Sequence, residues 1–203
     1  MNILITGSSG LIGTALTNFL SLKGHKVFKM QRGESVEVPF YWQPTETKIK
    51  FDPSICIDAV INLAGASIAE GRWNEKKKKL ILESRETGTK LLSTTLAKLG
   101  NRPKVLISGS AIGIYGDTGE KTVDENSATG SGFLAEVCKK WEKATLPATE
   151  GGIRTVLIRT GIVLSKEGGA LGKMLLPFKA GLGGVTGTGQ QYMSWISIRN
   201  FKI

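Results

Sequence analysis

The chain has 203 residues, of which 40% are apolar and 22% charged, and its formal net charge is +10. A chain of this length can bury one substantial core, or one domain and part of a second. No apolar run approaches the length of a membrane span, which excludes proteins built on transmembrane helices. Because His25 is the single histidine, and Cys56 and Cys138 match no CxxC pattern, we predict neither a metal site nor a disulfide.

The charge pattern and the first residues bear on partners and location. An apolar strand is predicted to begin at residue 2, which leaves no room for a signal or transit peptide, so we expect a cytoplasmic protein. The run Lys76–Lys79 fits either the solvated start of a helix or a nucleic-acid patch, and no aromatic interleaving favours the patch. We therefore expect a small-molecule substrate, no nucleic acid and no membrane as partners, with a homo-oligomer left open. The remaining positive charge would help to attract a phosphorylated cofactor or an anionic substrate.

The first thirteen residues have the pattern of a nucleotide-binding turn. Residues 3–5 predict a short buried strand, and from Leu11 the apolar residues recur at helical spacing. Between strand and helix, glycine permits a tight turn, close approach of a pyrophosphate and close helix packing, while the helix start presents free N–H groups. A glycine-rich turn without a ligand is the alternative. The residues predicted to bind a dinucleotide here are Gly7, Ser8, Ser9, Gly10, Leu11, Ile12 and Gly13.

Arg32 indicates which dinucleotide would bind. It follows the predicted second strand, residues 26–30, and lies 19 residues after Gly13, with no acidic residue between them. NAD-binding folds usually place Asp or Glu here, whereas a guanidinium suits the 2′-phosphate of NADP. We therefore predict NADP, with NAD as the second choice and an ordinary surface arginine as the alternative.

The remaining pattern alternates strands and helices. Residues 34–57 are predicted to be irregular, apart from one short strand around 48–51. Further strands are predicted at 59–63, 105–107 and 155–158, and further helices at 74–99 and 133–144. Such alternation predicts a doubly wound α/β domain with a parallel sheet and right-handed crossovers. We assign residues 1–165 to this domain, and the glycine-rich residues 166–203 to a substrate-side segment packed on it.

Small or polar residues follow two of these strands and are candidates for the site. Leu63, Ala64 and Gly65 end the strand at 59–63, where a backbone without large side chains could run beside a cofactor ribose. Ser108 follows the strand at 105–107 and is predicted to contact the cofactor as well. The polar, glycine-rich stretch 113–132 is typical of an active-site loop.

Six pieces together resemble an extended short-chain dehydrogenase/reductase, and more narrowly the sugar-nucleotide epimerase family. They are TGSSGLIG (6–13), NLAGASIAEGRW (62–73), SGSAIGIYGD (108–117), FLAEVCKKWE (133–142), RTGIVLSKEGGALGKMLLPF (159–178) and GLGGVTGTGQQYMSWI (181–196). The resemblance implies a Rossmann-type nicotinamide-binding domain with a small C-terminal substrate lobe. The family continues past Trp195–Ile196 into further strands and helices, so we expect that part of this lobe is missing.

The chain departs from the family where proton transfer is expected. Extended members use Tyr-x-x-x-Lys on a helix, in which lysine lowers the pKa of tyrosine. The equivalent positions here are Leu134 and Cys138, and neither has that chemistry. The usual Ser or Thr position is Ala111, next to Ser110, and an expected asparagine is replaced by Arg85.

Two functions stay open. Ser110 and Tyr115 are the best remaining catalytic candidates, with Tyr192 a weaker third. With them, the chain would be an NADP-dependent oxidoreductase or epimerase that acts by hydride transfer on a small carbonyl or nucleotide-sugar-like substrate. The alternative is a non-catalytic NADP-binding sensor or interaction protein that has lost the Tyr-x-x-x-Lys pair.

Overall fold

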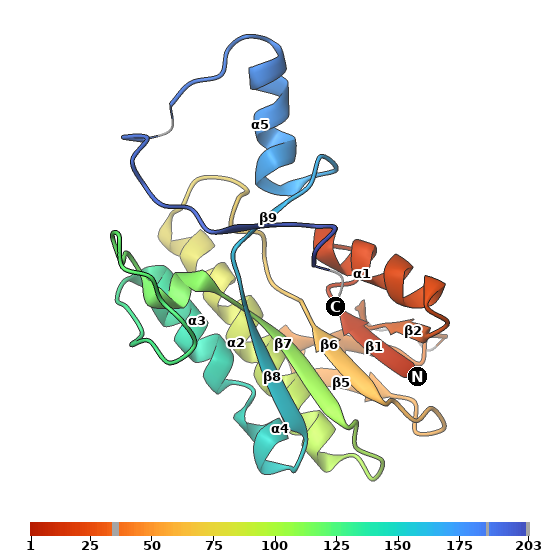
Figure 1. The fold of residues 1–203 in the computed structure, drawn as a ribbon. Helices are drawn as coiled ribbons and strands as arrows, with labels where there is room; N and C mark the ends of the chain where they lie inside the picture. Colours follow the sequence, from red (N-terminus) through yellow and green to blue (C-terminus); the bar gives the residue numbers. More distant parts are fainter. Residues whose placement is uncertain (34–36, 186, 202–203) are drawn as a thin grey trace.

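A five-stranded parallel sheet forms the centre of the protein (Figure 1), whose computed structural model describes residues 1–33, 37–185 and 187–201. The strand order is β2-β1-β6-β7-β8, so the chain first moves to one side of β1 and then to the other. The strands are β1 (Asn2–Thr6), β2 (Lys26–Lys29), β6 (Ala59–Asn62), β7 (Val105–Ala111) and β8 (Arg154–Thr160). The predicted doubly wound α/β fold is confirmed.

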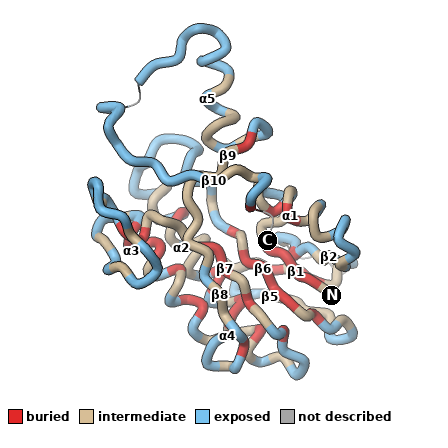
Figure 2. Tube along the Cα trace, in the orientation of Figure 1, coloured by how far each residue is buried: buried red, intermediate tan, exposed pale blue. Residues whose placement is uncertain are grey.

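Helices cover both faces of this sheet because its strands are apolar on both sides. Helix α1 (Leu11–Leu22) packs on one face against Ile3, Ile5 and Ile61. Helix α2 (Glu75–Lys98) packs on the other face, where Leu92 and Leu96 meet the core. Helices α3 (Phe133–Lys143) and α4 (Leu146–Glu150) lie on the α2 side (Figure 1). Figure 2 shows the buried residues concentrated along the central strands.

Three short strands within residues 31–51 form a second, small sheet, which corrects the prediction of a largely irregular segment. The predicted strand at 48–51 is present as β5 (Lys48–Phe51). It pairs antiparallel with β4 (Phe40–Gln43), which in turn pairs with β3 (Gln31–Arg32). A short helical turn, η1 (Pro44–Glu46), connects β4 to β5. Phe40 and Trp42 of β4 are buried at alternate positions, so the flanking prolines bound a strand rather than interrupt one. Residues 34–36 of this segment lie outside the described residues.

Part of the C-terminal segment extends away from the sheet, and residues 195–199 return to lie beside α1 (Figure 1). Strand β9 (Ile162–Leu164) pairs with β10 (Trp195–Ser197), and helix α5 (Gly169–Lys179) stands between them in the sequence. Figure 2 shows α5 and the chain after it as mainly exposed, while the start of α5 lies near Leu11. The predicted boundary at 165/166 falls between β9 and α5 and stays a prediction; residues 186, 202 and 203 lie outside the described residues. Among the described helices, none is long and apolar enough to cross a membrane.

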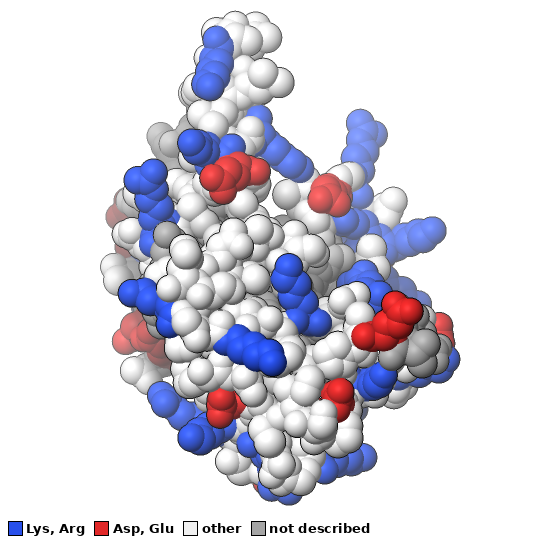
Figure 3. All heavy atoms as spheres, turned by 90° about the vertical axis from the view of Figure 1, so that its right-hand side faces the viewer, with Lys and Arg blue, Asp and Glu red and all other residues white. Residues whose placement is uncertain are grey.

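The run Lys76–Lys79 lies in the first turns of α2, after the N-cap residue Asn74. Lys78 pairs with Glu75 at 2.8 Å and Lys79 with Glu83 at 3.7 Å, as expected of a solvated helix start. On the face drawn in Figure 3, lysine and arginine side chains are spread out and do not form one patch. The expectation that no nucleic acid binds stays a prediction.

Gly13 sets how closely α1 approaches the turn after β1. A Cβ at Gly13 would overlap the carbonyl oxygen of Gly7, whereas a Cβ at Gly10 would lie 3.4 Å from the same oxygen. Packing inside the protein therefore requires glycine at position 13 but not at position 10.

We expect Gly13→Ala to lower the free energy of unfolding by about 2 kcal/mol or more, because backbone atoms must move to admit the methyl group. Gly10→Ala is the matched control and should change this free energy little, since its Cβ has room. Urea denaturation of the two variants measures the difference. Equal stability of the two would contradict this account of the turn.

Candidate functional site

The start of α1 is an uncapped helix N-terminus. The first helical hydrogen bond runs from the N–H of Thr14 to the carbonyl of Gly10, at 2.8 Å, so the N–H groups of residues 11–13 precede it. No side chain caps the helix, and no acidic residue lies in its first turn. Ser9 and Gly10 are exposed. The start of α1 therefore combines N–H groups without a helical partner, the positive end of the helix dipole and open space. This combination suits the negatively charged phosphate groups of a dinucleotide.

The loop after β6 lies directly against this turn. Gly7 has φ +68, and a Cβ there would lie 2.8 Å from the backbone of Leu63 and 2.9 Å from that of Ala64. The side-chain oxygen of Thr6 accepts hydrogen bonds from the N–H groups of Leu63 and Ala64, at 3.2 Å each. The predicted residues 7–13 and 63–65 therefore meet where the strand order reverses. In doubly wound sheets, ligands bind in the crevice at that position.

A buried polar network supports this crevice from inside the sheet. Thr6 donates to the Oδ1 of Asn62 at 2.7 Å, and the amide of Asn62 donates to Thr89 at 2.9 Å and Ser108 at 3.2 Å. Ser108 is fully buried, so its hydroxyl serves the network. The contact between Ser108 and a cofactor stays a prediction.

Arg32 lies on the β2 side of the crevice. It is exposed in β3, three residues after β2 ends, and pairs in register with Trp42. None of the ion pairs in the described ranges involves Arg32. The predicted contact with a 2′-phosphate stays a prediction, and the position leaves the guanidinium accessible to one.

Ser110 and Tyr115, the catalytic candidates, are joined by an ion pair that the sequence analysis missed. Arg159 of β8 contacts both carboxylate oxygens of Glu142, at 2.9 and 3.0 Å. Ser110 of β7 donates to Glu142 Oε1 at 2.6 Å, and Tyr115 accepts from Arg159 Nη1 at 2.9 Å. Tyr115 ends the short helix η2 (Ile112–Tyr115), directly after β7. The cluster thus links β7, β8 and α3 near the carboxyl ends of these two strands.

The electrostatics of this cluster follow from its geometry. Burial acts to raise the pKa of Glu142, but hydrogen bonds from Arg159 and Ser110 outweigh it, so the pKa lies below its ordinary value. The pKa of Arg159 is raised, chiefly by its hydrogen bonds to Glu142 and then to Tyr115. Both groups therefore stay charged at neutral pH, and their charges offset each other.

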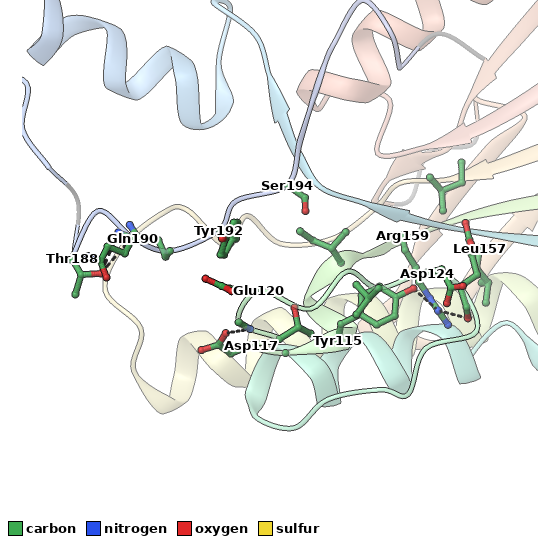
Figure 4. A pocket seen from close by; sticks show the side chains of 18 residues that line it. Tyr115, Asp117, Glu120, Asp124, Leu157, Arg159, Thr188, Gln190, Tyr192 and Ser194 are labelled. Carbon is green, nitrogen blue, oxygen red and sulfur yellow. Dashed lines mark hydrogen bonds between the residues drawn. The ribbon is translucent and has the colours of Figure 1, made fainter.

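Tyr115 also borders a cavity of about 1170 Å³, shown in Figure 4. The loop after Tyr115, the edge of β8 and residues 188–194 line it, and this last segment brings Tyr192 to the same cavity. Asp117, Glu120 and Asp124 make one wall acidic. Tyr192 is 73% exposed, and its role as a third donor stays a prediction.

The two helix positions that replace the tyrosine and lysine of the family lie on α3. Leu134 is 38% exposed, and Cys138 is buried. Burial raises the pKa of the Cys138 thiol, so it is neither a proton donor of the required kind nor a cation. The structure therefore agrees with the expectation that these positions cannot transfer the proton.

Arg85 of α2 is a second group whose setting the sequence did not reveal. Its Nη1 donates to the carbonyls of Ala66 and Ile81, at 3.1 Å each. Its guanidinium lies 5.1 Å from the ring centroid of Trp141 and packs against Gly65. The helical spacing placed Arg85 on α2, but only the folded chain shows that the side chain reaches the loop after β6.

Glu142→Gln should lower the free energy of unfolding by about 3 kcal/mol at pH 7, because it leaves the guanidinium of Arg159 without its charged partner. The pKa of Glu142 is depressed by folding, so this stabilisation is complete at neutral pH. The stabilisation begins to be lost when the pH falls below 4.5, the ordinary pKa of a glutamate. It is fully lost once the pH lies below the lower pKa that Glu142 has in the folded protein. The matched control is Glu136→Gln, which breaks an exposed pair with Lys139 on the same helix and should change stability little. Denaturation at pH 7 and at a series of lower pH values measures both effects, and a difference that does not shrink as the pH falls below 4.5 would contradict the assignment.

Comparison with known proteins agrees with this geometry. An epimerase family protein of Mycobacterium bovis is 45% identical over 201 residues, which are 98% of this chain and 65% of that protein. The chain thus spans slightly less than two thirds of the length of this relative.

Two solved structures have the same fold. The crystal structure of the nucleoside-diphosphate sugar epimerase from Corynebacterium glutamicum has a TM-score of 0.83 at 38% identity, covering 99% of this chain and 42% of that chain. The crystal structure of human epimerase family protein SDR39U1 (isoform 2) with NADPH has the same TM-score at 35% identity, covering 98% and 66%. The NAD dependent epimerase/dehydratase family matches residues 3–201. As the resemblance predicted, the chain belongs to this family.

Proposed function

We propose that the chain binds NADP across the carboxyl ends of β1 and β6 and acts as an NADP-dependent oxidoreductase or epimerase on a small carbonyl or nucleotide-sugar substrate. The observation that carries the proposal is the uncapped start of α1, held against the loop after β6. The human relative solved with NADPH, and the Corynebacterium relative named a nucleoside-diphosphate sugar epimerase, support the cofactor and the substrate class.

Each part of the crevice has a role in this proposal. Backbone N–H groups at residues 11–13 bind the pyrophosphate, and Gly10 leaves the space for it. The backbone at residues 63–65 lies beside a ribose, and Arg32 binds the 2′-phosphate. When bound, the cofactor supplies the hydride, and the protein must orient the substrate and handle the proton.

Tyr115 is the proton donor in this proposal. Its oxygen accepts a hydrogen bond from Arg159, which leaves its own O–H free to donate toward the cavity. Ser110 directs its proton to Glu142 and so holds the ion pair in place. For Ser110 to act on a substrate oxygen, its hydroxyl would have to turn away from Glu142.

A non-catalytic NADP-binding sensor is the second candidate, and the observation in its favour is the pair Leu134 and Cys138 on α3. Turnover of NADPH with a panel of carbonyl compounds and nucleotide sugars separates the two functions. Oxidation of NADPH with any of these substrates supports the enzyme. Saturable NADPH binding without turnover on the whole panel supports the sensor.

Arg32→Ala should weaken NADPH binding by about one to two decades, because a charge-assisted hydrogen bond contributes roughly 1.5–3 kcal/mol. NADH has no 2′-phosphate, so its affinity should change little. Arg154→Ala removes the same charge at the opposite, amino end of β8 and serves as the control. Fluorescence titration with both cofactors gives the dissociation constants, and an equal loss for NADPH and NADH would exclude the assigned role.

Tyr115→Phe keeps the ring and removes the hydroxyl, so the rate should fall about a hundredfold or more while NADPH still binds. Tyr41→Phe makes the same chemical change in β4 and should leave the rate unchanged. Steady-state rates and NADPH titrations on folded variants test this. Full activity of Tyr115→Phe would remove Tyr115 as the acid.

A further inference from the structure

Arg85 carries a positive charge, and its described hydrogen bonds go to neutral groups. These groups are the backbone carbonyls of Ala66 and Ile81, and the guanidinium also lies close to the Trp141 ring and to Gly65. In the part of the chain that the structure describes, no carboxylate forms an ion pair with it. Arg159, by contrast, is paired with Glu142 through two hydrogen bonds.

The surroundings of Arg85 weaken the screening of its charge. Trp141 and Cys138 are buried, and burial lowers the pKa of Arg85 from its ordinary value. Arginine nevertheless stays protonated in proteins. A cation in such surroundings acts on neighbouring charges more strongly than one in bulk water.

The fold places this charge on one half of the crevice. A dinucleotide lies across the point where the strand order reverses, with one nucleotide on each side. Arg32, on the β2 side, marks the adenosine half through its proposed contact with the 2′-phosphate. Arg85 lies against Gly65, after β6, and beside α3, which packs on β7. The other nucleotide, which carries the nicotinamide, therefore lies on the side of Arg85.

We infer that Arg85 makes the site favour the reduced cofactor over the oxidised one, an inference that rests on the NADP binding proposed above. The nicotinamide ring is positively charged in NADP⁺ and neutral in NADPH, and the two forms share every other group. A fixed guanidinium on this side repels the oxidised ring and leaves the reduced ring unaffected. The same charge stabilises the negative oxygen that develops when a carbonyl accepts a hydride. The charge thus favours the step in which a hydride passes from the cofactor to a carbonyl.

The test is the ratio of the dissociation constants of NADP⁺ and NADPH. NADPH is titrated by its fluorescence, and NADP⁺ by competition with it. In the unaltered protein NADP⁺ should bind about tenfold more weakly than NADPH, which corresponds to about 1.4 kcal/mol of repulsion between like charges in partly buried surroundings. Arg85→Gln and Arg85→Met should bring the ratio close to one, and Arg85→Lys, which keeps the charge, should retain most of it.

Arg32→Ala is the control, since the 2′-phosphate is common to both forms: both affinities should fall and the ratio should stay. Equal affinity for NADP⁺ and NADPH in the unaltered protein overturns the inference without any variant. A ratio that is unchanged in folded Arg85→Gln or Arg85→Met also overturns it. Failure of the unaltered protein to bind either form overturns the proposed function itself, so the two failures are distinguishable.

Discussion

The buried hydroxyl of Thr6 joins the two loops on which the site depends. It accepts hydrogen bonds from the N–H groups of Leu63 and Ala64 and donates one to Asn62. One oxygen atom therefore links the ends of β1 and β6. Because this position is fully buried, a group that lost its partner there would stay unsatisfied, at a cost of about 1–3 kcal/mol. Asn62 extends the network to α2 and β7. The turn that precedes α1 therefore has a fixed position relative to the loop after β6.

Arg159 and Arg85, which lie near the carboxyl ends of the strands, have different electrostatic roles. Arg159 is neutralised by Glu142 and holds Tyr115 and Ser110 in place, so its role is mainly to position other groups. Arg85 donates to neutral carbonyls and keeps its charge. Both lie near α3, whose two positions expected to hold tyrosine and lysine carry neither. Within the described ranges, the guanidinium that lies against Gly65 comes from α2.

The sequence predicted the parts of the fold that depend on local pattern. Apolar runs located the five strands of the main sheet, and the glycine spacing located the start of α1, because both reflect short stretches of chain. The pairing of β3, β4 and β5 was missed, since it depends on contacts between stretches that look irregular alone.

In the candidate site, too, the sequence predicted only the residues that depend on local pattern. Residues 7–13 and 63–65 were predicted from their positions after strands, and the structure brings them together. The link between Glu142 and Arg159 was not predicted, because a helix residue and a strand residue show no shared period in the sequence. The reach of Arg85 to Ala66 depends on a long side chain, whose direction no spacing specifies.

The burial of Cys138 has a consequence for the redox chemistry of the protein. A thiol reacts with oxidants and alkylating agents as the thiolate, and the raised pKa of Cys138 keeps it protonated at neutral pH. Cys56 is exposed and lies just before β6, at the end of the sheet opposite the carboxyl ends of the strands. Peroxide or a maleimide dye would therefore modify Cys56 and spare Cys138. A fluorophore could then be attached to this protein without touching the crevice.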